Sequence, residues 1–122
     1  MASVSKVLLS GSSGGRMIKV TLTATTGDLI HATTTVATTL DEIWLWGQNT
    51  STADVKATVE WGGTTVPDDQ IEQTIPAESG LIPLVRGWPL AGTGAAARNV
   101  RVFAGSANVI NVGGFVNRIS TA

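Results

Sequence analysis

Residues 53–61 read ADVKATVEW, and apolar and polar side chains alternate along most of this stretch. The apolar positions are Val55, Ala57, Val59 and Trp61. The polar positions are Asp54, Lys56, Thr58 and Glu60. Because successive side chains of a β-strand point to opposite faces, this pattern predicts a strand with its apolar face in the core and its polar face in water.

The same period of two appears upstream, at Met17–Ala24, and predicts a second half-buried strand. Its apolar face holds Ile18, Val20, Leu22 and Ala24. Further segments are rich in threonine and apolar residues and are separated by glycines and prolines, which favours short strands. They are Ser3–Leu9, Leu29–Ala37, Asp41–Gly47, Gln70–Ile75, Leu81–Val85, Asn99–Ala104 and Val109–Ile119.

Strands at a spacing of about 8–12 residues are typical of sandwiches and barrels. We expect an all-β fold, a single-domain antiparallel β-sandwich that is jelly-roll-like and has about eight or nine strands. The domain spans residues 1–122, because no linker or repeat divides the chain, and residues 1–15 are expected to be flexible or partner-dependent. We expect a loop at Gly92–Arg98 and a bend or bulge in the last strand at Gly113 and Gly114.

The composition excludes several classes of function. A chain of 122 residues without cysteine has no disulfide and no thiolate metal site, so its stability must come from packing. Eight basic and nine acidic side chains give a net charge of −1 with no basic run, so we expect no nucleic-acid binding. No membrane span and no secretory signal are visible, which predicts synthesis in a cytoplasm and no membrane partner.

Residues 60–80, EWGGTTVPDDQIEQTIPAESG, combine glycines and acids in a way that raises the question of a metal or phosphate site. The glycine pair at 62–63 fits a two-residue hairpin, and the prolines that follow fit further turns. A calcium loop needs about six oxygens, of which Asp68, Asp69 and Glu72 are only a fragment. We therefore expect no metal and no cofactor, and interpret these acids as a surface presented to a partner.

Two other segments could carry chemistry. The glycine-rich run Gly11–Gly15 lacks the lysine and the helix of a phosphate-binding loop, because Arg16 leads into a strand. His31 is the single histidine, so residue counts alone leave a Ser-His-Asp arrangement open. No G-x-S-x-G motif accompanies it, and the sequence favours a packed histidine, no catalytic residue and no enzyme.

The segment Ile43-Trp44-Leu45-Trp46 is apolar on both faces of its expected strand. A strand of a monomeric sandwich normally shows one polar face to water, so something covers the second face. A curved strand under loops, a subunit interface and an aromatic platform for a sugar ring all remain open. Trp88 lies in the turn-like segment Arg86-Gly87-Trp88-Pro89-Leu90, and it either joins that surface or plugs the end of the sandwich. The candidate interface residues are Trp44, Trp46, Trp88, Asp68, Asp69 and Glu72.

Several segments also carry a resemblance to known proteins. They are VLLSGSSGGRMIKVTLTAT with DLIHATTT, LDEIWLWGQNTS, EWGGTTVPDDQIEQTIPAESGLIPLV and ANVINVGGFVNRI. Together they resemble a family of small proteins that tailed bacteriophages and prophages encode among their virion structural genes. The resemblance covers nearly the whole chain, and it lies in fold-forming segments rather than in a catalytic signature.

This resemblance implies a structural part of a phage particle, most directly a head decoration (cement) protein. Such a protein is a β-sandwich or jelly-roll module, commonly a homotrimer, that binds the major capsid protein on the outer surface of the shell and stabilises it. The expected location is therefore the virion surface, after synthesis in the host cytoplasm. The alternative is a tail-associated β-module that binds a carbohydrate or a receptor.

Overall fold

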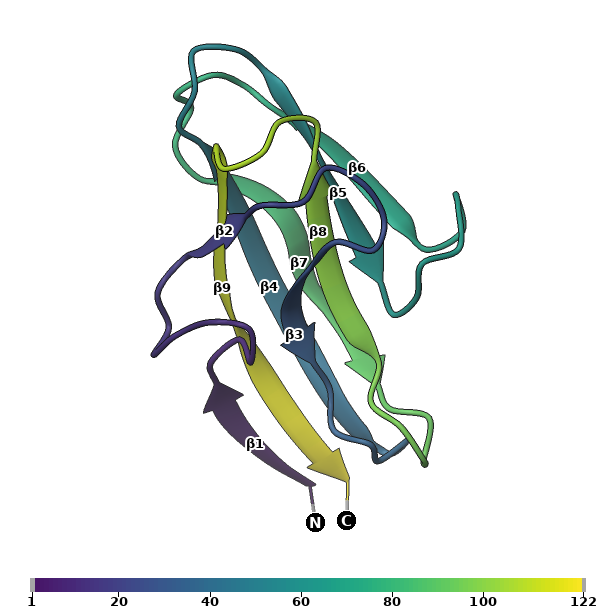
Figure 1. Ribbon diagram of the computed structural model, residues 1–122. Coiled ribbons are helices and arrows are strands. Elements are labelled where there is room, and N and C mark those ends of the chain that lie inside the picture. The colour runs from purple at the N-terminus through teal and green to yellow at the C-terminus, as the bar shows by residue number, and fades with distance from the viewer. Residues whose placement is uncertain (1, 122) are drawn as a thin grey trace.

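The computed structural model describes residues 2–121, which form nine β-strands and no helix (Figure 1). The strands are β1 (Ala2–Val7), β2 (Ile18–Val20), β3 (Asp28–Ala32), β4 (Thr39–Asn49), β5 (Val55–Trp61), β6 (Gln70–Ile75), β7 (Ile82–Ala91), β8 (Asn99–Ala104) and β9 (Ile110–Thr121). No helix in this part of the chain is long and apolar enough to cross a membrane. The all-β prediction is confirmed.

The strands form two antiparallel sheets. One, the β4 sheet, has the order β1-β9-β4-β7, with β2 also paired to β9. The other, the β5 sheet, has the order β3-β8-β5-β6. In Figure 1 the strands of the two sheets lie along roughly the same axis, and the start of β1 lies beside the end of β9.

The pairings are nested around the middle of the chain. β5 pairs with β6, β4 with β7, β3 with β8, and β2 with β9. These pairs alternate between the two sheets, so the chain forms one long antiparallel ribbon that is folded back at residues 62–69 and wrapped into a sandwich. β1 adds to the outside of β9, and Ala2 pairs with Thr121.

The core lies between the inner faces of the two sheets. Fully burying side chains of this size contributes roughly 1.5–3 kcal/mol each, which makes this layer the main source of stability. The predicted apolar positions of β5 supply part of it, since Val55, Ala57 and Val59 are buried. Other core residues come from β4, β8 and β9: Ile43, Leu45, Val100, Val102, Val112 and Val116.

Several strand boundaries differ from prediction, and the second strand differs most. β2 covers only Ile18–Val20, whereas Met17–Ala24 was predicted. The Asp28 carboxylate accepts the backbone N–H groups of Thr21 at 2.6 Å and Leu22 at 3.1 Å. These two N–H groups therefore bond to a side chain and not to a neighbouring strand. Leu22 is exposed rather than buried.

β7 is twice as long as the predicted segment Leu81–Val85, because it continues to Ala91. The turn expected around Gly87 and Pro89 is instead strand, paired to β4 through two register shifts. Proline is tolerated here because β7 is an edge strand, so part of its backbone needs no ladder partner.

The structure also differs from two predictions that were made from glycine pairs. The connection from β5 to β6 spans residues 62–69, so the predicted two-residue hairpin at Gly62 and Gly63 is wrong. In β9, the pairing with β4 carries no register shift at Gly113 and Gly114. Gly114 serves a close approach instead, since a Cβ there would lie 1.9 Å from the carbonyl oxygen of Trp44.

The polar face of β5 is covered, which the alternation did not predict. Thr58 and Glu60 are each only 1% exposed. The segment before β3 covers Glu60, because the Thr25 hydroxyl and the Gly27 N–H both donate to the Glu60 carboxylate. The outer face of this sheet is therefore partly enclosed by its own chain.

Candidate interaction surfaces

Three aromatic side chains gather on the outer face of the β4 sheet. Trp44 and Trp46 point outward from β4, while Ile43 and Leu45 between them are fully buried. Phe115 of β9 pairs directly with Trp44 and lies on the same face. We call these three half-buried residues the aromatic face. The sequence analysis did not identify Phe115 as part of this face, because a local pattern does not show which strands pair in the sheet.

The three rings are nearly parallel and lie in one compact group. Their centroids form an almost equilateral triangle, with Phe115 at 6.1 Å from each indole and the indoles 6.3 Å apart. The angles between ring planes are 12°, 16° and 27°. The three rings therefore form one compact triangular cluster with nearly parallel planes.

Charged and polar residues contact this aromatic cluster and help to hold its rings in position. Lys6 of β1 places its Nζ 4.7 Å from the centroid of the Phe115 ring, a cation–π arrangement. The Nε1–H of Trp44 donates to Glu42 at 2.9 Å, and Asn117 donates to the same oxygen at 3.0 Å. These hydrogen bonds, that of Trp44 first, hold the pKa of Glu42 below its ordinary value.

The aromatic face continues into other apolar side chains on the same side of the sheet. Val4 pairs with Ile119, and Ile119 pairs with Leu40, so all three point outward. Val4 is 65% exposed and Met17, which lies against Gly113, is 42% exposed. An apolar surface of this extent marks a contact site in many soluble proteins.

Trp88 does not join the aromatic face. It pairs with Ile43, whose side chain lies in the core, so Trp88 is on the inner side of the β4 sheet at its open edge. Its ring contacts Trp61 of the β5 sheet at 6.2 Å between centroids and a tilt of 57°. This position agrees with the prediction that Trp88 lies at the end of the sandwich and not with the prediction that it joins Trp44 and Trp46.

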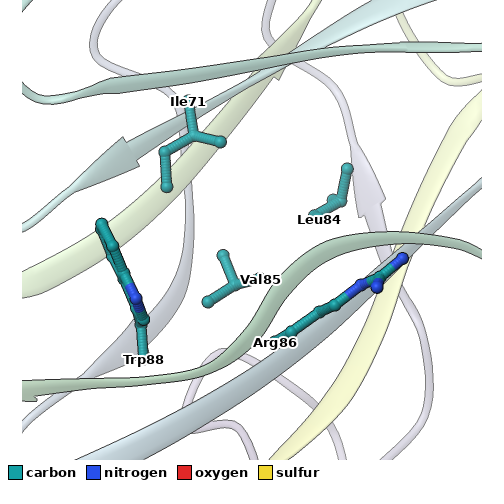
Figure 2. Close-up of a pocket in the computed structure, with 5 residues that line it drawn as sticks. All are labelled: Ile71, Leu84, Val85, Arg86 and Trp88. Carbon is teal, nitrogen blue, oxygen red and sulfur yellow. The ribbon is translucent and has the colours of Figure 1, made fainter.

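A hollow opens beside Trp88, between the edge strands β6 and β7. Its volume is about 270 Å³, and its lining residues are Ile71, Leu84, Val85, Arg86 and Trp88. Figure 2 shows Ile71 and Trp88 on one side, Leu84 and Arg86 on the other, and Val85 between them. The other lining side chains are apolar, and Arg86 directs its guanidinium away from Trp88 (Figure 2), because it pairs with the outward-pointing Trp44. We refer to this feature as the hollow.

The three predicted acids have three different environments. Asp69 is part of the turn, where its carboxylate accepts the N–H of Thr65 at 3.0 Å. Glu72 on β6 forms an exposed ion pair with Lys56 at 2.8 Å. Asp68 is exposed, and within residues 2–121 its side chain makes no hydrogen bond or ion pair. Among residues 2–121 no three His, Asp or Glu side chains gather closely enough to hold a metal ion.

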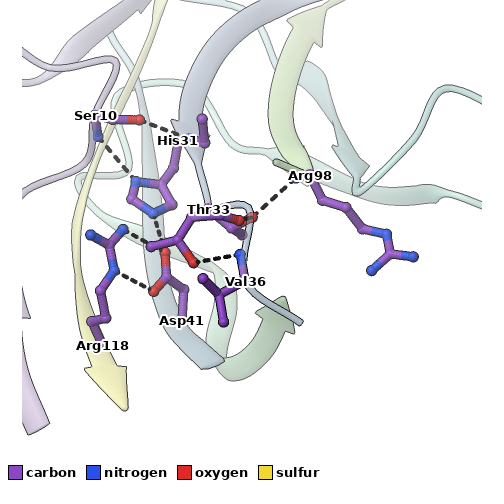
Figure 3. Close-up of polar contacts among 9 residues, drawn as sticks. Ser10, His31, Thr33, Val36, Asp41, Arg98 and Arg118 are labelled. Atoms are coloured by element: carbon purple, nitrogen blue, oxygen red, sulfur yellow. Dashed lines mark hydrogen bonds and ion pairs between the residues drawn. The ribbon is translucent and has the colours of Figure 1, made fainter. Parts of the chain in front are cut away.

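His31 belongs to a buried polar cluster that joins four segments (Figure 3). Its Nδ1 accepts the backbone N–H of Ser10 at 3.0 Å, and its Nε2 lies 2.7 Å from the carboxylate of Asp41. Arg118 of β9 donates to both oxygens of that carboxylate, at 2.8 and 2.9 Å. His31 and Asp41 are both fully buried.

The electrostatics of the cluster favour an ionised Asp41. Burial by itself raises the pKa of this carboxyl, but the hydrogen bonds from Arg118 and His31 outweigh it and hold the pKa below its ordinary value. The hydrogen bond to Asp41 in turn raises the pKa of Arg118. Removing one partner of a buried charge pair lowers the stability of the fold strongly, because the other charge is then buried without a partner.

The same geometry differs from a Ser-His-Asp triad. In a triad the serine hydroxyl contacts the imidazole, and the carboxylate contacts its other nitrogen. Here the backbone N–H of Ser10 occupies the first position, while its hydroxyl accepts the N–H of Ala32 at 2.7 Å. The cluster therefore ties the loop before β2 to β3, β4 and β9.

Comparison with known proteins adds no relative. No protein-family model matches the chain, and no match was found among curated proteins or solved structures.

Proposed function

We propose that this chain is a structural protein of a tailed-phage virion, a head decoration protein that binds the outer surface of the shell. In this proposal it contacts the major capsid protein and stabilises the assembled head. It acts as a homotrimer at the virion surface and requires neither a cofactor nor catalysis. The resemblance of its fold-forming segments to phage structural proteins supports this role.

The observation that carries the proposal is the aromatic face. The outer face of a sheet in a free-standing sandwich is normally polar, whereas this one carries Trp44, Trp46 and Phe115 with apolar neighbours. Large aromatic side chains are enriched where proteins meet, because each removes a large apolar area from water. A protein that works by contact area needs a surface of this kind.

The strand order supports a finer description of the fold, the jelly roll. A jelly roll is an antiparallel ribbon of eight strands wrapped into two sheets, and the nested pairings of β2 to β9 have that form. Viral capsid domains are among the proteins built this way, and so are lectins. The fold therefore agrees with a virion role without determining it.

Binding to heads tests the proposal. Added to undecorated, expanded heads of its own phage, the protein should co-sediment saturably and raise the temperature at which they rupture, because a ligand of the intact shell stabilises that state. Since the net charge is only −1, binding should persist at about 0.5 M salt, where screening is strong.

Variants locate the contact. Trp46→Arg should lose shell binding, because it puts a charge into the aromatic face. Leu29→Arg is the matched control: Leu29 is an exposed apolar residue of β3, in the other sheet, and its replacement should leave binding unchanged. Heads that sediment without the wild-type protein would refute the proposal.

A second candidate, a carbohydrate-binding module of the tail, is favoured by the cluster of three nearly parallel aromatic rings, since sugar rings pack against aromatic side chains. In that case the protein should pellet with host polysaccharide or with tails rather than heads. Its tryptophan fluorescence should change on polysaccharide binding, and Trp46→Arg should abolish that change.

A further inference from the structure

An amine, an amide and a carboxylate form one row across the outer face of the β4 sheet. Lys6 of β1 pairs directly with Asn117 of β9, and Asn117 pairs directly with Glu42 of β4. The adjacent row of the same three strands faces the core, so this row points outward: Val7, Val116 and Ile43. Opposed side chains in such a sheet have Cβ atoms roughly 4.5–5.5 Å apart, so the lysine side chain can reach the amide.

The amide and the carboxylate are already in contact. Nδ2 of Asn117 donates a hydrogen bond to Oε1 of Glu42 at 3.0 Å, and Nε1 of Trp44 donates to the same oxygen at 2.9 Å. These hydrogen bonds, that of Trp44 first, hold the pKa of Glu42 below its ordinary value, so at neutral pH the carboxylate is ionised and can accept a proton. Nδ2 is the atom that leaves when a nucleophile displaces ammonia from the amide. Glu42 therefore lies against the leaving group.

The amine lies on the same face of the sheet. Nζ of Lys6 is 4.7 Å from the centroid of the Phe115 ring. Phe115 is two residues from Asn117 on β9, so their side chains are neighbours on this face. Among residues 2–121 no hydrogen bond or ion pair engages Nζ. The flexible lysine stem can therefore turn the amine from the ring to the amide carbon without breaking another polar contact.

We propose that Nζ of Lys6 forms an isopeptide bond with Cγ of Asn117 and that Glu42 carries the proton. The lysine first loses its third proton to water, because only the neutral amine is a nucleophile. As the Nζ–Cγ bond forms and the Cγ–Nδ2 bond breaks, Glu42 takes one of the two remaining protons from Nζ and gives it to Nδ2. Ammonia leaves with this proton and its own two, and Glu42 is ionised again, so no further reactant is needed.

The bond fixes the most exposed strand of the sandwich. In β1 the residues from Ala2 to Lys6 are all exposed, and the strand lies at the edge of the sheet against β9 (Figure 1). Joining residue 6 to residue 117 closes most of the chain into a covalent ring, which restricts the unfolded chain. Because the sheet holds the two groups side by side, the reaction is intramolecular. It happens once in each chain and does not depend on shell binding.

A second row on the same face provides an internal control. Lys19 of β2 pairs with Asn111 of β9, and Asn111 pairs with Gln48 of β4. The lysine and the asparagine thus have the same strand relationship as those of the first row, but the third residue carries no carboxylate. Because a carboxylate is needed to move the proton, Lys19 and Asn111 should stay unlinked in the same molecule.

The test is the intact mass of the purified full chain by mass spectrometry, before and during incubation between about pH 7 and 10. The wild type should be lighter than its sequence mass by one ammonia, about 17 Da, and the loss should be faster at higher pH, because more of the amine is neutral. Lys6→Arg keeps the positive charge and should keep its full mass. Glu42→Gln keeps a hydrogen-bond acceptor for Asn117 and should react at least about a hundredfold more slowly. A protease digest of the wild type should contain one fragment that joins Lys6 to Asn117.

The Lys6→Arg variant also excludes the other route to the same mass, in which Asn117 loses ammonia to its own backbone, because that route needs no lysine. The inference is overturned by a wild type that keeps its full mass at every pH, by a mass loss that persists in Lys6→Arg, or by Glu42→Gln reacting as fast as the wild type. Equal linkage of Lys19 to Asn111 would overturn the part assigned to Glu42. None of these measurements uses phage heads, so a failure of head binding contradicts only the proposed function.

Discussion

The indole of Trp44 lies directly over Gly87 of the neighbouring strand, where a Cβ would come within 2.6 Å of the ring. Gly87 also has a φ of 74°, a conformation that side chains other than glycine rarely adopt. We expect Gly87→Ala to displace Trp44 and to lower the free energy of unfolding by about 1–3 kcal/mol. Urea unfolding followed by tryptophan fluorescence measures this. An unchanged midpoint and spectrum would mean that Trp44 is not held on this glycine.

Asp41 makes stability depend on pH in the acid range. Because its pKa is lowered by folding, its contribution is complete above the ordinary value of 3.8 and is lost as the pH falls through the lower pKa of the folded state. Asp41→Asn should remove that part of the pH dependence and cost about 3 kcal/mol at neutral pH, since it leaves Arg118 without its partner. Urea midpoints between about pH 2 and 7 test this. The prediction is wrong if the urea midpoints of the wild type and of Asp41→Asn change with pH in the same way.

The tautomer of His31 follows from its neighbours. A backbone N–H donates to Nδ1, so the proton of the neutral ring must be on Nε2, facing Asp41. Because the chain has a single histidine, ¹⁵N NMR of a histidine-labelled sample reports it without ambiguity. We expect the pattern of a neutral ring protonated at Nε2 at neutral pH. A ring protonated at Nδ1 would show that the contact with Ser10 is absent in solution.

Two glutamates on the outer face of the β5 sheet should differ in how much they contribute to the free energy of unfolding. Glu60 is buried and accepts the N–H of Gly27 at 2.7 Å, so Glu60→Ala leaves buried donors unpaired and should cost about 1–3 kcal/mol. Glu72 forms an exposed pair with Lys56, so Glu72→Ala should cost at most about 1 kcal/mol. Urea unfolding of the two variants under the same conditions tests this difference. Equal losses in the free energy of unfolding would contradict the prediction.

Local sequence patterns predicted the fold class well. The alternation in 53–61 placed a strand correctly because the period of side chains along a strand is a local property. They failed at Glu60, where the alternation predicted a water-facing side chain. What covers it is the segment around Gly27, more than thirty residues earlier in the chain, and no local pattern records that.

The candidate site was predicted only in part. Trp44 and Trp46 were recognisable because a strand with two apolar faces is unusual in a sandwich. Phe115 was missed because it joins them through the pairing of β4 with β9, which depends on the global topology. Trp88 was assigned to a turn because glycine and proline flank it, although an edge strand tolerates both.

The nested ribbon also has a consequence for the order in which the chain folds. If β5 and β6 pair first, only residues 62–69 must be closed into a loop, and each later pair adds to an existing end. Pairing β2 with β9 first would close a loop about ten times longer, at an extra entropic cost of about 2 kcal/mol. We expect kinetic φ-values, from the effects of mutations on folding rates, to be higher at Val59 and Ile71 than at Val20. The 62–69 turn would then be the folding nucleus, and strand pairing would spread from it outward to β2 and β9.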